Sequence, residues 1–219
     1  MNYRKQPLVN EGIYHILNKS IAEYKIFSNN FHFRRMMQLL VYYQYANVPV
    51  RYSYFIKLDP QEQDEVFRYL QIKNDKLVDI ISYCLMPTHY HLILKQLLKG
   101  GISKYINLIQ NSYAKYFNIK HDRNGPLWQG YFKNVLVDTD EQLLHLTRYQ
   151  HINPVSAGLV EDPIEWEYSS YKEYIGKKQT KICSYNNLID VRPKIYKRFV
   201  ENRISYQREL TRIKKIILE

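Results

Sequence analysis

The chain has little cysteine: only Cys84 and Cys183 occur among its 219 residues, far apart and in unlike contexts. Two cysteines exclude a disulfide framework of the kind that holds small secreted domains together. They also exclude a zinc site built from four cysteines. A metal site in this protein would therefore have to use other ligand types.

Long apolar runs are absent as well. The first residues, MNYRKQPLVNEGIYHILN, lack the uninterrupted apolar core of a signal peptide. No apolar run approaches the roughly 20 residues that are needed to cross a bilayer. We therefore expect a soluble, cytoplasmic protein with no membrane partner.

Acidic residues are outnumbered, since 21 Asp and Glu stand against 32 Lys and Arg and give a net charge of +11. This charge favours a polyanionic partner, nucleic acid first and an anionic membrane surface second. The 22 tyrosines suit stacking on unpaired bases, although many of them must belong to the core or to amphipathic surface. A basic surface that binds nothing is the alternative. The charge indicates a class of partner and not a function.

Length and hydrophobic content predict one domain with an appended tail. Hydrophobic residues make up 45% of the chain, which is enough for a real core. We assign residues 1–176 to the domain. Residues 177–219 are basic, end in ISYQRELTRIKKIILE and are expected to form a helical tail. This tail either docks on the core or lies along a nucleic acid, and a solvated charged face is an equal alternative.

Hydrophobic periodicity predicts helices that alternate with strands. The expected strands span residues 12–18, 77–86, 89–96 and 131–137. The expected helices span residues 29–46, 60–73, 102–116 and a segment from Asp140 that ends before Pro154. Such an alternation indicates an α/β or α+β sandwich around one sheet.

His89 and His91 flank Tyr90 in CLMPTHYHLIL, a segment that otherwise has the pattern of a buried strand. Side chains two residues apart in a strand point to the same face. Both imidazoles can then converge on one metal ion while Tyr90 packs on the opposite face. Because two histidines also meet by chance, the pair needs support from a second segment.

RYQHINPVSAGLV, sixty residues further on, could supply a nucleophile. Tyr149 lies near the end of the expected helix and shares a face with His145, while Asn153 follows four residues later. A phenol needs a metal or a base to attack phosphorus at neutral pH. Residue type alone does not select Tyr149 over the 21 other tyrosines, of which Tyr113 and Tyr116 are equal candidates.

The choice among these tyrosines rests on a resemblance to a known family, which the chain order of several motifs indicates. MPTHYHLIL, QNSYAKYFN, GPLWQGYFKNV and LLHLTRYQHINPVSAGLV follow one another, with GIYHILNKS before them and WEYSSYKEYIG after them. Together they resemble the single-tyrosine HUH transposases, and most of all the REP-associated tyrosine transposases and their insertion-sequence-200 relatives. The resemblance spans roughly residues 10–176.

The resemblance implies a fold, a metal site and a nucleophile. The fold would be a ferredoxin-like βαβ sandwich of the α+β class, with a central antiparallel sheet and helices packed on it. His89 and His91 would bind a divalent cation, Mg²⁺ or Mn²⁺, and Asn153 would assist the metal. Tyr149 would be the catalytic residue. Residues 1–176 would then form an HUH catalytic domain.

The sequence departs from the family pattern at a few places. Thr88 stands where the branch often has Asn, and Tyr131 stands where it often has Arg. The segment between residues 46 and 76 is longer than in the smallest members. None of these departures removes a catalytic group, and Lys133 remains a candidate phosphate contact near Tyr131.

Other residues near the motifs divide into two groups. The candidates for contact with nucleic acid are Arg148, Lys133, Lys115 and Arg123. The remaining candidates have simpler structural explanations: His145 and His121 as surface histidines, His15 and His151 as packed or hydrogen-bonded imidazoles, and Trp128 as a core residue.

The sequence thus predicts an endonuclease and strand transferase that acts on hairpin-bearing single-stranded DNA through a 5′-phosphotyrosine. Relatives include monomers and dimers with shared active sites, so a homodimer stays open. One alternative is a domesticated relative that holds a nucleic-acid hairpin without cutting it. Another is a zinc hydrolase, which would need a third strong ligand that no nearby Cys, Asp or Glu supplies.

Overall fold

A four-stranded antiparallel sheet forms the centre of the protein in the computed structural model, which describes residues 7–178, 182–185, 187–190 and 192–204. The strand order is β2-β3-β1-β4. The strands are β1 (Ile13–Lys19), β2 (Val78–Met86), β3 (His89–Gln96) and β4 (Lys133–Leu136). Each predicted strand is confirmed to within two residues at its ends.

The two faces of the sheet belong to different cores, and strand alternation decides which residue faces which core. On β3, Tyr90, Leu92 and Leu94 are buried in the first core. Ile93 is buried in the second core, on the opposite face. His89 and His91 share the face of Ile93, so Tyr90 packs away from the two imidazoles as the alternation predicts.

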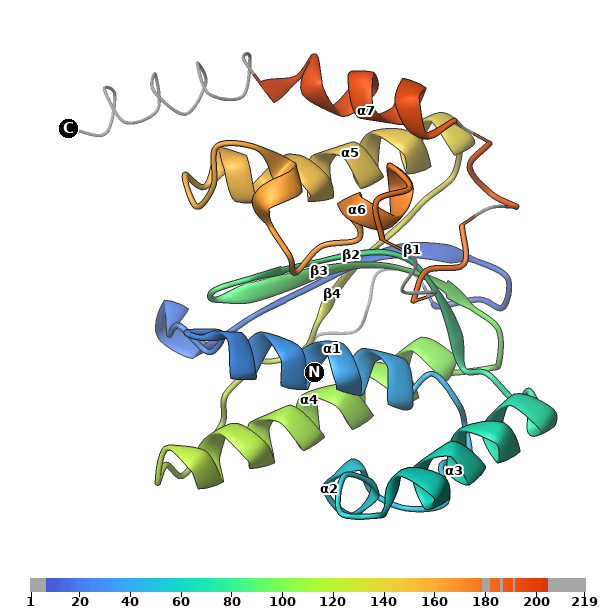
Figure 1. Ribbon diagram of the computed structural model, residues 1–219, viewed down its shortest axis with the longest axis vertical. Helices are drawn as coiled ribbons and strands as arrows, with labels where there is room; N and C mark the ends of the chain where they lie inside the picture. The colour runs from blue at the N-terminus through green and yellow to red at the C-terminus, as the bar shows by residue number, and fades with distance from the viewer. Residues whose placement is uncertain (1–6, 179–181, 186, 191, 205–219) are drawn as a thin grey trace.

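Helices α1 (Asn30–Tyr42) and α4 (Gly101–Lys120) cover the first face of the sheet (Figure 1). Helix α4 follows the predicted three- and four-residue spacing and buries its apolar stripe against the strands. The buried members of this stripe are Ile102, Tyr105, Ile106, Ile109 and Tyr113. Helix α4 extends to Lys120, beyond the predicted end at residue 116.

Helix α1 is shorter than predicted, because it ends at Tyr42 and not at residue 46. Tyr45 leaves the helix to form a β-bridge with Lys76, and the Ala46 N–H donates to the Asp75 carbonyl. These bonds join residues some thirty positions apart, so the local apolar pattern contains no sign of them.

Two helices lie outside α1 and α4, at the bottom of Figure 1. Helix α3 (Pro60–Lys73) has the predicted bounds, and Asp59 and Glu62 form a capping box at its start. Helix α2 (Tyr52–Phe55) was not predicted, since four residues are too few for a helical period to show. Both lie in the segment between residues 46 and 76.

The second face of the sheet is covered by α5 (Asp140–Ser156), α6 (Tyr171–Tyr174) and α7 (Pro193–Glu201), as Figure 1 shows. Two short 3₁₀ helices, η1 (Ile21–Glu23) and η2 (Pro163–Glu165), complete the described elements. The second core joins α5 to the strands through Leu143, Ile152 and Ile93.

The predicted end of the helix before Pro154 is wrong, because α5 continues through Pro154 to Ser156. A proline removes one intrahelical hydrogen bond because it has no N–H group. Pro154 lies only two residues before the end of α5, so the loss affects the last turn alone. Ala157 still donates to the Asn153 carbonyl at 2.9 Å. Pro154 and Val155 are both buried, so packing holds the final turn together.

The order β1-α1-β2-β3-α4-β4, with α2 and α3 inserted after α1, is that of a ferredoxin-like sandwich. The predicted α+β fold with a central antiparallel sheet is confirmed. Within the expected tail, α7 packs against α5 and α6. Most of the terminal stretch ISYQRELTRIKKIILE lies outside the described residues.

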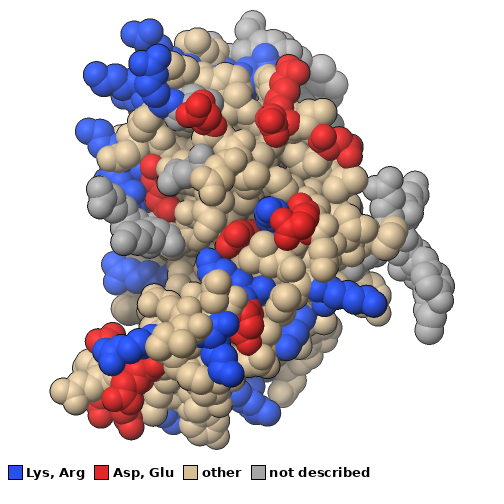
Figure 2. All heavy atoms as spheres, turned by 90° about the vertical axis from the view of Figure 1, so that its right-hand side faces the viewer, with Lys and Arg blue, Asp and Glu red and all other residues tan. Residues whose placement is uncertain are grey.

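The positive charge is not gathered into a single patch on the face that Figure 2 shows, where basic and acidic side chains are interspersed. Among the described helices, none is both long and apolar enough to span a bilayer.

Candidate active site

His89 and His91 lie side by side on β3 and face α5. The centroids of the His89 and His91 rings are 5.1 Å apart. Tyr90 between them is fully buried on the other face, where its hydroxyl accepts a hydrogen bond from the Gln110 side chain at 2.6 Å. This bond holds Tyr90 on the face of the sheet opposite the two imidazoles.

Each imidazole has its Nδ1 atom engaged in a hydrogen bond. The Nδ1 of His91 lies 3.0 Å from Nε2 of His15, whose ring stacks on that of His91. The Nδ1 of His89 lies 2.9 Å from the Thr88 hydroxyl. These contacts leave the Nε2 atom of both His89 and His91 for a metal, the arrangement in which outer hydrogen bonds orient metal ligands.

Both imidazoles are neutral near pH 7. Burial, helped by the charge of Lys19, lowers the pKa of His89 to about 4, against a weaker opposing effect of Glu23. Burial, with His15 and His89 beside it, lowers the pKa of His91 to about 2. Neutral imidazole is the form that binds metal.

Helix α5 brings Tyr149 to this pair within one chain. The Tyr149 and His91 ring centroids are 5.7 Å apart, with the rings nearly perpendicular. Tyr149 is 49% exposed, whereas its neighbour Gln150 is buried and accepts a hydrogen bond from Ser82 on β2. The buried neighbour anchors the helix and leaves the phenol facing solvent.

Asn153, one turn beyond Tyr149, is half-buried, and its side-chain nitrogen is buried without a hydrogen-bond partner among the described residues. Rotation of the amide exchanges this nitrogen for an oxygen, so the side chain offers an unused polar position. No cluster of three or more His, Cys, Asp or Glu suited to a metal occurs in the described part of the chain. Two neutral imidazoles and an amide fit a hard cation that keeps waters better than a structural zinc ion.

Strand pairing places two lysines on the histidine face of the sheet. Lys19 on β1 is paired with His89, while Leu17 is paired both with His91 and with Lys133 on β4. Directly paired residues share a face. Lys133, the candidate phosphate contact, therefore lies on the same face as the two histidines. Lys19 is a second exposed cation on this face, and nothing in the sequence singled it out.

Arg148 adjoins the nucleophile candidate but is held by other side chains. Its guanidinium lies 4.0 Å from the centroid of the Phe199 ring and donates to Nδ1 of His145 at 2.7 Å. Burial lowers the pKa of Arg148, with the charge of Arg203 acting in the same direction. Arg148, His145 and Tyr149 line one small pocket of about 190 Å³.

The other two candidates for nucleic-acid contact are not near Tyr149. Lys115 is exposed on α4, on the opposite side of the sheet. Arg123 follows α4 and donates to the Asn118 side chain and to the Pro126 carbonyl, both at 2.9 Å. Arg123 thus stabilises the loop in which it lies through hydrogen bonds.

The structural explanations of the remaining residues are confirmed. His151 is buried with its nitrogens 2.7 Å from the Tyr196 hydroxyl and 2.8 Å from the Ser170 hydroxyl. Trp128 packs against the first core, and His145 and His121 are exposed. His15 is hydrogen-bonded as expected, but its partner His91 could not be identified without the register of β1 against β3.

Comparison with known proteins assigns the chain to a family. Residues 37–151, more than half of the chain, match the model of the family described as transposase IS200-like. This match places the chain in the class of transposase-family proteins. The chain belongs to the IS200-like transposases, and the predicted resemblance is confirmed.

Two relatives refine this assignment. A Haemophilus influenzae protein named as a REP-associated tyrosine transposase is 26% identical in an alignment of length 105 that covers 42% of this chain and 58% of that protein. The chain thus matches only a little over half the length of this relative. The solved structure of a REP-associated tyrosine transposase bound to a REP hairpin has the same fold, with a TM-score of 0.53 and 15% identity over 87% of this chain and 94% of that one.

Proposed function

We propose that the protein is a divalent-metal-dependent endonuclease and strand transferase that acts on hairpin-bearing single-stranded DNA. The observation that carries this proposal is the contact between the Tyr149 and His91 rings at 5.7 Å within one chain. Phenol, phosphate and metal must lie within contact reach of one another for such a reaction. The half-exposed phenol is accessible to a DNA strand.

Tyr149 is the nucleophile in the proposed reaction. Its phenolic oxygen, having lost its proton to solvent, forms a bond to the scissile phosphorus. The bond from phosphorus to the 3′-oxygen breaks, and this oxygen takes up a proton from solvent. The products are a 5′-phosphotyrosine and a free 3′-OH. Attack of another 3′-OH on the phosphotyrosine restores a phosphodiester without an external energy source.

His89, His91 and Asn153 would hold the cation, Mg²⁺ or Mn²⁺. When bound, such a cation acts as a Lewis acid on a phosphoryl oxygen and offsets the charge that develops there. The chain contributes the orientation: His15 and Thr88 engage the Nδ1 atoms and so direct both Nε2 atoms to one side. Lys19 and Lys133, on the same face, are suited to hold the flanking phosphates.

The proposed substrate draws on the solved relative, which is bound to a REP hairpin. The basic charge of +11 supports a nucleic-acid partner, with an affinity that falls as salt rises. Because Tyr149 reaches His91 in the same chain, the reaction needs one copy only. A homodimer would add a second site and not complete the first.

The decisive experiment is a covalent-adduct assay. The protein is incubated with end-labelled hairpin-bearing single-stranded DNA and Mn²⁺, and adducts are separated on a denaturing gel. We expect an adduct with the unaltered chain and none with Tyr149→Phe, because phenylalanine carries no oxygen. Tyr131→Phe is the matched control, since Tyr131 is 85% exposed, and it should form the adduct.

Other outcomes of this assay would reject the proposal. Tight binding without an adduct in any metal would identify a hairpin-binding protein that does not cut. Hydrolysis by Tyr149→Phe in the presence of zinc would identify a zinc hydrolase.

A further inference from the structure

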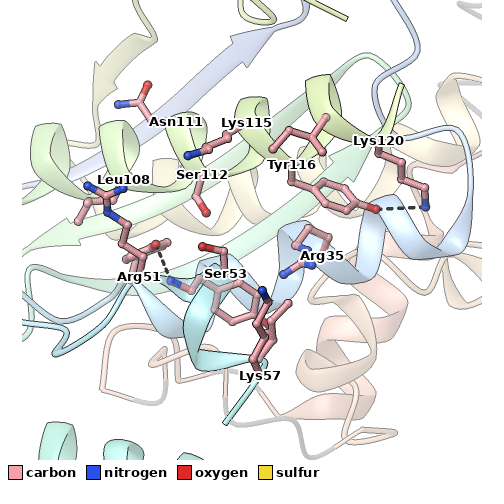
Figure 3. A pocket seen from close by; sticks show the side chains of 14 residues that line it. Arg35, Arg51, Ser53, Lys57, Leu108, Asn111, Ser112, Lys115, Tyr116 and Lys120 are labelled. Carbon is pink, nitrogen blue, oxygen red and sulfur yellow. Dashed lines mark hydrogen bonds between the residues drawn. The ribbon is translucent and has the colours of Figure 1, made fainter. Parts of the chain in front are cut away.

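A pocket of about 610 Å³ opens between α1, α2 and α4 (Figure 3). These helices lie on the side of the sheet away from α5, the helix that contains Tyr149 (Figure 1). Pockets of this size accommodate a small organic ligand or a short segment of a polymer. Helix α2 forms one of its walls. The proposed reaction at Tyr149 does not use this pocket.

The pocket is strongly basic. Five cationic side chains line it and no carboxylate does: Arg35, Arg51, Lys57, Lys115 and Lys120. Within the described part of the chain, none of the five forms an ion pair with Asp or Glu. Such a group of uncompensated cations attracts an anion, and several phosphates in a row would neutralise more of them than one carboxylate could.

The walls between these cations are aromatic and aliphatic. The Arg35 guanidinium lies between two rings, 5.0 Å from the centroid of Tyr52 and 4.7 Å from that of Tyr116. Ile119, which also lines the pocket, is 72% exposed and adds an apolar side chain to this wall. A ligand with a flat apolar part would cover this surface and meet the cations with its charged part.

We infer that this pocket binds single-stranded nucleic acid, with an unpaired base against Tyr116 and Ile119 and the adjoining phosphates on the surrounding cations. Aromatic and apolar contacts to bases, joined to cations that follow the backbone, are how proteins hold single strands. Ser112 and Asn111, at the same wall, add hydrogen-bonding groups for a base edge. An acidic peptide would satisfy the cations but would leave the apolar wall exposed.

The inference deepens the proposed function and rests on it for the identity of the partner as nucleic acid. The sheet separates the pocket from Tyr149, because α1 and α4 cover one face and α5 covers the other (Figure 1). A substrate that occupies both sites must pass around an edge of the sheet. The pocket would therefore act on affinity and choice of substrate, and not on the bond that is cut.

Binding is measured by fluorescence anisotropy in the Tyr149→Phe background, so that no strand is cut. The probe is a labelled oligothymidylate, and its competitors are an abasic oligonucleotide with the same number of phosphates and a blunt hairpin. We expect the oligothymidylate to bind about 10-fold more tightly than the abasic strand, the scale of one stacked base.

The pocket variant is Arg51→Ala with Lys57→Ala, since both side chains are exposed on or beside α2. The matched control is Arg68→Ala with Lys99→Ala, which removes the same charges from exposed positions outside the pocket. In the pocket variant, affinity should fall about 10-fold and the slope of log affinity against log salt should decrease by about 1.4, or roughly 0.7 for each lost contact. The control should change affinity less than about 3-fold.

The base contact is tested separately with Tyr116→Leu, which should remove the preference for the oligothymidylate over the abasic strand. Equal losses in the pocket variant and the control would overturn the inference, as would equal binding of the abasic strand. Competition by polyglutamate as effective as that by oligothymidylate would also overturn it.

The two proposals fail in different ways. Absence of an adduct together with base-dependent binding in the pocket rejects the reaction and keeps the pocket. An adduct together with binding that the pocket substitutions do not affect rejects the pocket and keeps the reaction.

Discussion

His15 and Thr88 touch no substrate in the proposed reaction, yet each engages the Nδ1 atom of a histidine that we propose as a metal ligand. The contacts are His15 Nε2 to His91 at 3.0 Å and the Thr88 hydroxyl to His89 at 2.9 Å. The Thr88 hydroxyl supplies this hydrogen bond from the residue directly before His89. Both are positioning residues, because they act through another side chain.

We expect His15→Phe to raise the Mn²⁺ concentration for half-maximal adduct formation by about 10- to 100-fold, the usual loss when a metal ligand loses its outer hydrogen bond. Phenylalanine keeps a ring that can stack on His91 but removes the bond to Nδ1. Metal titration of the adduct assay measures the effect.

The control for this prediction is His15→Gln, which retains a hydrogen-bonding group and should recover part of the metal affinity. If His15→Phe lowered the maximal amount of adduct without shifting the metal titration, His15 would have a different role.

For single residues, the face of a strand could be predicted from the sequence, whereas the pairing between strands required the structure. Alternation in a strand was enough to place His89 and His91 on one face and Tyr90 on the other. The register that pairs Leu17 with both His91 and Lys133 was not readable, because pairing between distant segments leaves no local signal. The partners of His15 and the position of Lys19 could therefore not be predicted.

At the scale of elements, α7 is attached to α5 by a buried polar chain. The Tyr196 hydroxyl donates to Thr147 Oγ1 at 2.9 Å and lies 2.7 Å from His151 Nδ1. All three residues are buried. Part of the predicted tail is thus bound to the helix that carries Tyr149.

We expect Tyr196→Phe to lower the free energy of unfolding by about 1–3 kcal/mol, because the change leaves a buried imidazole nitrogen without a partner. Urea denaturation measures this difference. Tyr54→Phe removes a hydroxyl from a side chain that is 62% exposed and should change the free energy of unfolding by less than about 0.5 kcal/mol. A loss in Tyr196→Phe as small as in this control would mean that the polar chain does not hold α7.

Elements with strong local patterns were predicted well, and those fixed by distant contacts were not. Pro60 and the acidic first turn gave α3 its bounds. Helix α1 ended early because Tyr45 pairs with Lys76, and α5 continued past Pro154 because Val155 is packed in the second core. The basic pocket could not be predicted, since it needs α1, α2 and α4 together.

For the whole molecule, buried histidines make stability depend on pH. Burial lowers the pKa of His151 from 6.5 to about 3 and, with the charges of Lys120 and His121, the pKa of His32 to about 4. The unfolded chain binds these protons near pH 6.5 and the folded chain does not. Between those values the unfolded state holds more protons, so stability rises with pH and is lost on acidification.

We expect the free energy of unfolding to fall by up to about 1.4 kcal/mol per pH unit from His151 alone as pH decreases from about 6 to 4. Denaturant unfolding at a series of pH values, without added metal, measures the slope. His151→Gln should reduce the slope by this amount, because the other buried histidines still contribute, and the control is His145→Gln at an exposed position. Equal slopes in all three proteins would show that His151 binds its proton equally in the folded and unfolded chains, and would contradict the prediction.

The sheet keeps the tyrosine and the basic pocket in separate layers with separate cores. A substitution in α2 meets side chains of the first core, whereas His89, His91 and Tyr149 lie on the other side. If both proposals hold, a change in the strand that the pocket binds need not disturb the residues that cut DNA. The side of the sheet with the pocket and the side with Tyr149 can therefore diverge independently in evolution. Helix α2 is the natural place at which to introduce a preference for a different nucleic acid.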